Sequence, residues 1–205
     1  MLFYAVFMLT HFLIIIFIDM QPFYPKEVVP PWLGQLPKDY IALSQDPLVI
    51  GVHSPVKNLH YVWFESMAVW IEGFMQTPLA FFGALALVKS KSYAWIIVLT
   101  YGLITFPTLI PCFAHILAIP TTDINHITKE GITTLTSWQK QFILANYAPF
   151  GIVPFIMSVD AAYRIYHQIK MLSNIQEAAE KSNMLGALLD AGLEGRLNVD
   201  TKERG

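Results

Sequence analysis

Apolar residues along the chain gather into four long runs that are separated by polar segments. The runs cover about residues 2–19, 61–88, 93–118 and 142–165. A helix needs roughly 20 mostly apolar residues to cross the hydrocarbon core of a bilayer, because each residue adds only about 1.5 Å. The pattern therefore predicts an all-α membrane protein, a bundle of four transmembrane helices.

The first run also has the position of a secretory signal peptide. However, no basic residue precedes its apolar stretch, and no small-residue cleavage site follows it. The stretch is also longer than the apolar region of a usual signal peptide. We therefore expect residues 2–19 to be retained as a helix.

The segments outside the runs differ in composition. Residues 20–60 are rich in proline, which lacks a backbone donor, so we expect a long loop here rather than a spanning helix. Residues 119–141 form a second polar loop. We expect the membrane domain to cover residues 1–171, and residues 172–205 to form a polar cytosolic tail. This tail is expected to be solvated or disordered rather than a helix that binds a partner, although Leu185, Leu188, Leu189 and Leu193 give it a faint helical stripe.

Positive charges indicate the orientation of the bundle. Lys89 and Lys91 lie in the tight turn between the second and third runs, and Arg164 and Lys170 follow the fourth. With four spans, all of these residues share one side of the membrane with both termini. Because short segments with Lys and Arg stay in the cytosol, we expect both termini to be cytosolic.

Composition and charge exclude several functions. The chain is 55% hydrophobic and only 14% charged, with a mean hydropathy of +0.48 and a formal net charge of −2. This balance argues against a nucleic-acid-binding protein, which needs a basic surface. Cys112 is the single cysteine, so neither an intramolecular disulfide nor a cysteine-based zinc site is available. We expect no metal and no cofactor.

Polar residues at membrane depth are the candidate ligand-binding residues, because their burial there is costly. Asp19 ends the first run. Glu72 lies roughly 16 Å below the non-cytosolic surface, near mid-membrane, and Gln76 follows it on the same helix face. Thr108 and Tyr147, in the third and fourth runs, lie roughly 15 Å and 8 Å deep.

A pocket between the helices is expected at the same level. Thr105 lies one turn deeper than Thr108, and His115 lies nearer the surface. Each proline in a helix bends it and frees a carbonyl group, which must find a partner or line a cavity. The prolines concerned are Pro78, Pro107, Pro111, Pro149 and Pro154.

The charges of this pocket suggest its ligand. The spans contain no Lys or Arg near Asp19 or Glu72. Two buried carboxylates without a cation are unfavourable, so either one is protonated and bonds the other, or a cationic ligand binds there. A sterol or a lipophilic amine, with one polar group on a large apolar body, would suit such a site. Each candidate residue also has a structural interpretation, as a helix cap or as a hydrogen bond between helices.

These motifs resemble the sigma-2 receptor (transmembrane protein 97) family, endoplasmic reticulum membrane proteins built on the EXPERA domain. The resemblance covers about residues 8–165 in order and spacing. It is carried by Phe17-Ile-Asp19-Met-Gln21, Pro25-Lys-Glu27, Asp46-Pro-Leu48, Trp63-Phe-Glu-Ser66, Glu72, Gln76, Pro78, Thr108-Leu-Ile-Pro111, Tyr147-Ala-Pro149 and Pro154-Phe-Ile156.

The resemblance implies a four-helix fold with a lipid-accessible pocket. In this family the aspartate that matches Asp19 engages a ligand amine, and the glutamate that matches Glu72 hydrogen-bonds to that aspartate. The family binds sterols and acts in sterol homeostasis and trafficking, while a fungal branch is associated with the delivery of mitochondrial proteins from the endoplasmic reticulum surface. A homodimer is possible because the helices carry exposed aromatic faces.

The EXPERA domain also includes the emopamil-binding protein, a sterol isomerase that resembles this chain at Ile71-Glu72-Gly73. That enzyme has a histidine one turn before the glutamate, where this chain has Ala68, and a second acid on its third helix. No acid lies between Tyr93 and Cys112. Because a carbocation mechanism needs an acid and a base, we expect binding without isomerase activity.

Three hypotheses follow from the residues together with the resemblance. The first is a protein that binds a sterol or a lipophilic amine in an acidic pocket and acts in lipid homeostasis or trafficking. The second is a membrane adaptor or chaperone that assists delivery of mitochondrial proteins, and the third is a sterol isomerase-like enzyme.

Overall fold

The computed structural model describes residues 1–54, 59–124, 127–128, 131–132 and 134–203, with the backbone alone for residues 127–128, 131–132 and 187–203. The chain divides into two compact units, Met1–Ala162 and Tyr163–Gly205. Within the described residues, four helices are long and apolar enough to cross a membrane. They cover Leu2–Asp19, Leu59–Val88, Ala94–Ala118 and Ser137–Gly186. The predicted fold class, an all-α protein with four membrane-spanning helices, is confirmed.

Two of these four helices change their winding part of the way along. The first consists of α1 (Leu2–Ile14) and a π-helical turn (Ile15–Asp19). The second consists of a 3₁₀ turn (Leu59–Tyr61), α4 (Val62–Met67), a π-helical segment (Ala68–Gln76) and α5 (Thr77–Val88). The third is α6 (Ala94–Ala118), and the fourth lies in α7 (Ser137–Glu203).

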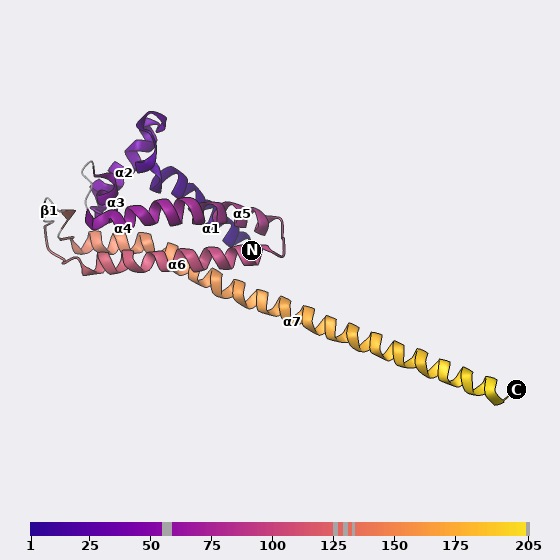
Figure 1. Ribbon diagram of the computed structural model, residues 1–205. Coiled ribbons are helices and arrows are strands. Elements are labelled where there is room, and N and C mark those ends of the chain that lie inside the picture. The colour runs from indigo at the N-terminus through magenta and orange to yellow at the C-terminus, as the bar shows by residue number, and fades with distance from the viewer. Residues whose placement is uncertain (55–58, 125–126, 129–130, 133, 204–205) are drawn as a thin grey trace. The chain divides into compact units, whose positions relative to one another are not determined.

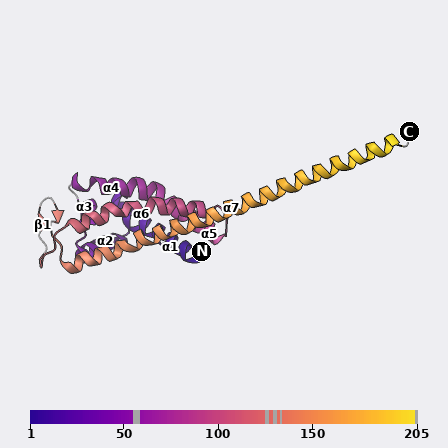
Figure 2. The same cartoon turned by 90° about the horizontal axis from the view of Figure 1, so that it is seen from below.

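The helices pack as antiparallel neighbours (Figure 1). α1 packs along α5, and α5 packs along α6. Two views show that the N-terminus lies at one end of the bundle, whereas α2, α3 and β1 lie at the other end (Figures 1 and 2). The loop between α6 and α7 contains a short antiparallel hairpin of β1 (Ile127–Thr128) and β2 (Gly131–Ile132).

Small residues allow the helices to approach closely, which is the usual way that helices pack in lipid. A Cβ atom on Gly83 of α5 would collide with the side chain of Met8 on α1. A Cβ atom on Gly102 of α6 would collide with the carbonyl oxygen of Pro154 and with Ser158 on α7. Glycine at these two positions therefore sets the spacing of two helix pairs.

The prediction of a long loop for residues 20–60 is wrong in its conformation. This segment forms two 3₁₀ turns (Gln21–Phe23 and Lys26–Val28), α2 (Pro31–Ser44) and α3 (Pro47–His53). Both helices start with a proline, whose missing N–H is not needed in the first turn. Neither helix is long enough to cross a membrane, as expected. Residues 55–58 of the predicted loop lie outside the described residues.

The predicted end of the fourth helix also differs from the structure. α7 begins at Ser137, before the predicted start near residue 142, and its backbone stays helical to Glu203. The backbone of the described part of residues 172–205 thus continues α7. The side chains of residues 172–186 are exposed, as in a solvated helix.

Candidate functional site

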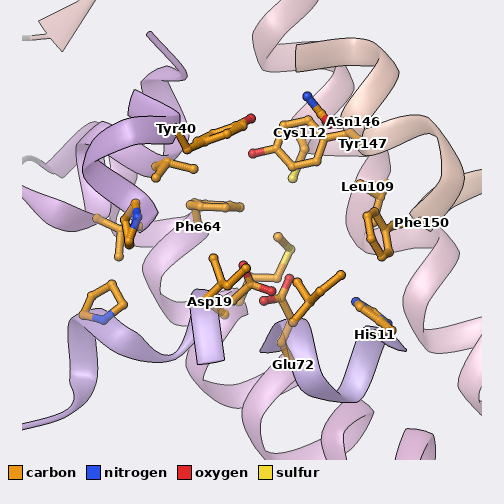
Figure 3. Close-up of a pocket in the computed structure, with 18 of the residues that line it drawn as sticks. His11, Asp19, Tyr40, Phe64, Glu72, Leu109, Cys112, Asn146, Tyr147 and Phe150 are labelled. Atoms are coloured by element: carbon orange, nitrogen blue, oxygen red, sulfur yellow. The ribbon is translucent and has the colours of Figure 1, made fainter. Parts of the chain in front are cut away.

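A cavity of about 310 Å³ lies inside the unit formed by Met1–Ala162. Its wall is mostly apolar and comes from α1, α2, α3, α4, α6 and α7 together with the two π-helical segments (Figure 3). Apolar walls with a few polar groups are typical of small-molecule sites. The predicted intramembrane pocket is therefore present.

Asp19 and Glu72 both line this cavity, and their carboxyl groups point toward one another in Figure 3. Each lies on a π-helical segment, Asp19 at the end of Ile15–Asp19 and Glu72 within Ala68–Gln76. Such segments occur frequently at functional sites, because the extra residue in the turn redirects side chains and leaves backbone groups to be satisfied locally. Here the Thr77 hydroxyl donates to the Glu72 carbonyl oxygen at 2.7 Å.

Among the described residues of the cavity wall, the basic side chains are the histidines His11 and His53. Among the described residues that line the cavity, none is a lysine or an arginine. Asp19 and Glu72 are only partly buried, and both are cavity-lining residues. The arrangement can therefore share a proton between the two acids or accept a cationic group from a ligand.

Gln76 and Thr108 have different surroundings. Gln76 lines the cavity and is 1% exposed, and its Nε2 has no hydrogen-bond partner among the described residues. Thr108 is also buried, but its hydroxyl donates to the Thr105 carbonyl oxygen at 2.7 Å within α6. Of these two, the structure brings only Gln76 to the described part of the cavity wall.

Tyr147 lines the cavity but bonds to an acid that sequence reasoning did not select. Its hydroxyl donates to Oδ2 of Asp46 at 2.9 Å, and the Tyr40 hydroxyl donates to the same oxygen at 2.9 Å. The other oxygen, Oδ1, accepts the backbone N–H groups of Leu48 and Val49 at the start of α3. We call Asp46, Tyr40 and Tyr147 the Asp46 clasp.

The Asp46 clasp is fully buried at its centre, since Asp46 is 0% exposed. Burial raises the pKa of Asp46, while the hydrogen bonds from Tyr147 and Tyr40 act in the opposite direction. Burial, followed by the nearby Asp46 carboxylate, raises the pKa of Tyr40. The clasp thus joins the segment before α3 to α7 through protonated phenols.

His11 is a further cavity residue that sequence reasoning missed. It is buried in α1, its Nδ1 shares a hydrogen bond with the Tyr101 hydroxyl, and its ring centroid lies 4.9 Å from that of Phe150. The rule that singled out the acids, an ionisable group inside a span, also applies to His11.

His115, which the sequence placed nearer the surface, packs against Tyr61 at a centroid distance of 5.7 Å.

The site offers no evident metal centre within the described part of the chain. There, no group of three or more His, Cys, Asp or Glu side chains is placed to hold an ion. Cys112 is buried beside the cavity, and its thiol donates to the Thr108 carbonyl oxygen at 3.3 Å.

Comparison with known protein families places this site within a recognised domain. The family model described as EXPERA (EXPanded EBP superfamily) matches residues 32–161. The matched range includes Asp46, Glu72, Gln76 and Tyr147, whereas Asp19 and His11 precede it.

Proposed function

The chain belongs to the EXPERA (EXPanded EBP superfamily) family, and we propose that it binds a lipophilic amine or a sterol through Asp19 and Glu72. The observation that carries this proposal is the pair of carboxyl groups facing each other in an apolar cavity whose described wall contains no lysine or arginine. An amine or hydroxyl group on the ligand would supply the hydrogen-bond donor, and an amine also the positive charge, that lysine or arginine does not provide here.

The energetics support a ligand with a charged or strongly polar end. A hydrogen bond to a charged group is worth about 1.5–3 kcal/mol, and it gains strength where water is excluded. The apolar wall, with Ile14, Phe64, Met67 and Leu109, would bury the body of the ligand and provide the hydrophobic part of the affinity. A membrane protein can take up such molecules directly from lipid.

Purified protein in lipid nanodiscs tests the proposal by titration with a radiolabelled lipophilic tertiary amine and, separately, a radiolabelled sterol. We expect Asp19→Asn and Glu72→Gln to weaken amine binding by about 10- to 100-fold, the loss of one charge-assisted hydrogen bond. The control is Asp39→Asn, because Asp39 is an exposed acid on α2 that accepts from Gln35 at 2.8 Å. Unchanged amine affinity in both cavity variants would refute the proposal.

Cys112 provides an independent readout, because the single cysteine of the chain lines the cavity. A bound ligand should slow its reaction with methyl methanethiosulfonate, and Cys112→Ala should remove the signal. Slowing that persists in Asp19→Asn at the same ligand concentration would argue against binding through the acid pair.

We further propose that the protein acts in sterol or lipid homeostasis or trafficking in the endoplasmic reticulum, with both termini in the cytosol. The family assignment and the lysines at the ends of the spans support this. Protease protection of terminal epitope tags in sealed microsomes tests the orientation. Protection of either tag would contradict it.

Catalysis of double-bond isomerisation is not part of this proposal. Position 68 is alanine, and the α6 residues of the described cavity wall, Leu109 and Cys112, carry no carboxyl group. His11 does bring an imidazole to the cavity, so the test includes incubation with sterol isomerase substrates and product analysis. Turnover that is lost in Glu72→Gln would overturn the proposal of binding alone.

A second candidate is a membrane adaptor for delivery of mitochondrial proteins. It is favoured by the helical backbone beyond residue 161, where α7 continues to Glu203 outside the matched family residues. If this is the main role, deletion of residues 172–205 would impair mitochondrial protein import more than Asp19→Asn does. The reverse order would favour the ligand-binding function.

A further inference from the structure

The cavity has polar groups at two separate places in its wall. Asp19 and Glu72 lie at one end in the view of Figure 3, and the hydroxyl groups of Tyr40 and Tyr147 face one another at the other end. Phe64 lies between them in this view. All five residues line the same cavity, so one elongated ligand could touch both ends.

The hydroxyl protons of Tyr40 and Tyr147 are already used in hydrogen bonds. A tyrosine hydroxyl has one proton to donate and lone pairs that accept. Tyr40 and Tyr147 both donate to Oδ2 of Asp46 at 2.9 Å. Each phenol oxygen therefore has only acceptor capacity left for a molecule in the cavity.

The hydrogen bonds around Asp46 fix this arrangement. Oδ1 of Asp46 accepts from the backbone N–H of Leu48 at 3.0 Å and that of Val49 at 3.4 Å, which leaves Oδ2 for the phenols. The Ser44 hydroxyl donates to the Tyr40 carbonyl oxygen at 2.7 Å and accepts from the Asp46 N–H at 3.1 Å. The phenol oxygens of Tyr40 and Tyr147 are thus held in place by the buried, hydrogen-bonded side chains of Asp46 and Ser44.

From this geometry we propose that the cavity selects ligands with a hydrogen-bond donor at both ends: an amine or hydroxyl for Asp19 and Glu72, and a second O–H or N–H group for the oxygens of Tyr40 and Tyr147. The inference rests on the proposed function, since it concerns the same cavity. Amino alcohols and diamines with an apolar body belong to this class. A ligand whose far end is a methyl group or an ether oxygen lacks the second donor. The phenol oxygens then accept no hydrogen bond from the ligand.

A series of synthetic amines tests the inference directly. All members carry a tertiary amine at one end and an apolar body of graded length, and the far end is methyl, methyl ether or hydroxyl. At the best length, the hydroxyl compound should bind wild-type protein about five- to tenfold more tightly than the other two, as expected for one net hydrogen bond. The methyl ether controls for polarity, because it can accept but cannot donate.

Three variants and one control separate the phenol groups from the rest of the cavity. Tyr40→Phe and Tyr147→Phe should each reduce the preference for hydroxyl while the methyl compound keeps its affinity. Tyr61→Phe is the matched control, because Tyr61 is buried against His115 and outside the described cavity wall. Asp46→Asn is the sharpest variant, since the Asn amide can donate to the phenol oxygens and free their protons to face the cavity.

In Asp46→Asn the preference should therefore move toward the methyl ether, which accepts those protons. Circular dichroism and the melting temperature confirm that each variant is folded. If the methyl compound binds wild type in an Asp19-dependent manner but hydroxyl brings no advantage at any length, this inference is overturned and the proposed function stands. If neither the amines of this series nor the radiolabelled sterol binds, the proposed function itself fails.

Discussion

The Tyr147 hydroxyl donates a hydrogen bond to Oδ2 of Asp46, a residue 101 positions earlier in the chain, at 2.9 Å. This bond links α7 to the start of α3; its donor Tyr147 lines the cavity, whereas Asp46 is not among the described lining residues. The acid that organises this end of the cavity is therefore distinct from the acids that face the ligand space.

Replacement of Asp46 by alanine should destabilise the protein. The change removes the cap of α3, worth about 1 kcal/mol, and leaves two partly buried phenol groups without their acceptor, at about 1 kcal/mol or more each. We expect a loss of about 3 kcal/mol or more in the free energy of unfolding, measured by denaturant titration in detergent micelles. Asp46→Asn should lose less, because the amide can still bond to the phenols. Equal stability of wild type and Asp46→Ala would show that the clasp is not structural.

Asp46 should also make stability depend on pH. Burial raises the pKa of Asp46 above its ordinary value of 3.8, so the folded protein holds this proton more tightly than the unfolded chain does. Its contribution to stability is then fully present below about pH 4 and is lost as pH rises through the folded-state pKa. With rising pH, the melting temperature of wild type should fall relative to that of Asp46→Asn, which has no group to titrate here. Parallel melting curves for the two proteins would contradict this.

Enlarging Gly102 should disturb the packing of α6 on α7. A side chain there would collide with the Pro154 carbonyl oxygen and with Ser158, and overpacking of a tight contact costs about 1–3 kcal/mol. We expect Gly102→Val to lower the melting temperature. Gly186→Ala is the control, because a Cβ at that position meets nothing within 4 Å. Alanine favours helix over glycine, so this variant should be neutral or slightly stabilising.

His11 and Tyr101 should be energetically coupled. They share a hydrogen bond between two buried side chains, so removal of either partner leaves the polar group of the other without this hydrogen bond. In a double-mutant cycle with His11→Ala and Tyr101→Phe, the coupling energy should be about 1 kcal/mol. Melting of the two single variants and the double variant provides the values. Strictly additive losses would mean that the bond contributes nothing to stability.

The four spans could be predicted because length and apolarity suffice to identify a membrane helix. The position of Asp19 at the end of the first span and that of Glu72 within the second also follow from counting residues along a helix. Depth alone does not fix the direction of a side chain. It selected Thr108, whose hydroxyl bonds within α6 to the Thr105 carbonyl oxygen, alongside residues that do line the cavity.

Other features were missed because their signal in the sequence was ambiguous, absent or not followed up. The partner of Tyr147 is Asp46, in a proline-rich segment that was interpreted as a loop, because prolines at helix starts and prolines in loops look alike. A π-helical turn contains one extra residue but keeps the segment apolar, so the hydropathy pattern of Ala68–Gln76 does not reveal it. His11 met the criterion used for the acids and was detectable.

Under the proposed function, the π-helical segment Ala68–Gln76 separates the orientation of Glu72 from the packing of the fold. Each residue of an α-helix turns the chain by about 100°, so removing Gly73 would rotate Glu72 by about that angle relative to α5. α5 would remain packed on α1, and the helix would still be long enough to span the bilayer. Deletion of one residue would thus abolish the proposed binding while Asp19 and Glu72 both remain in the sequence. Conversely, insertion of one residue into a regular helix is enough to point its acidic side chain in a new direction.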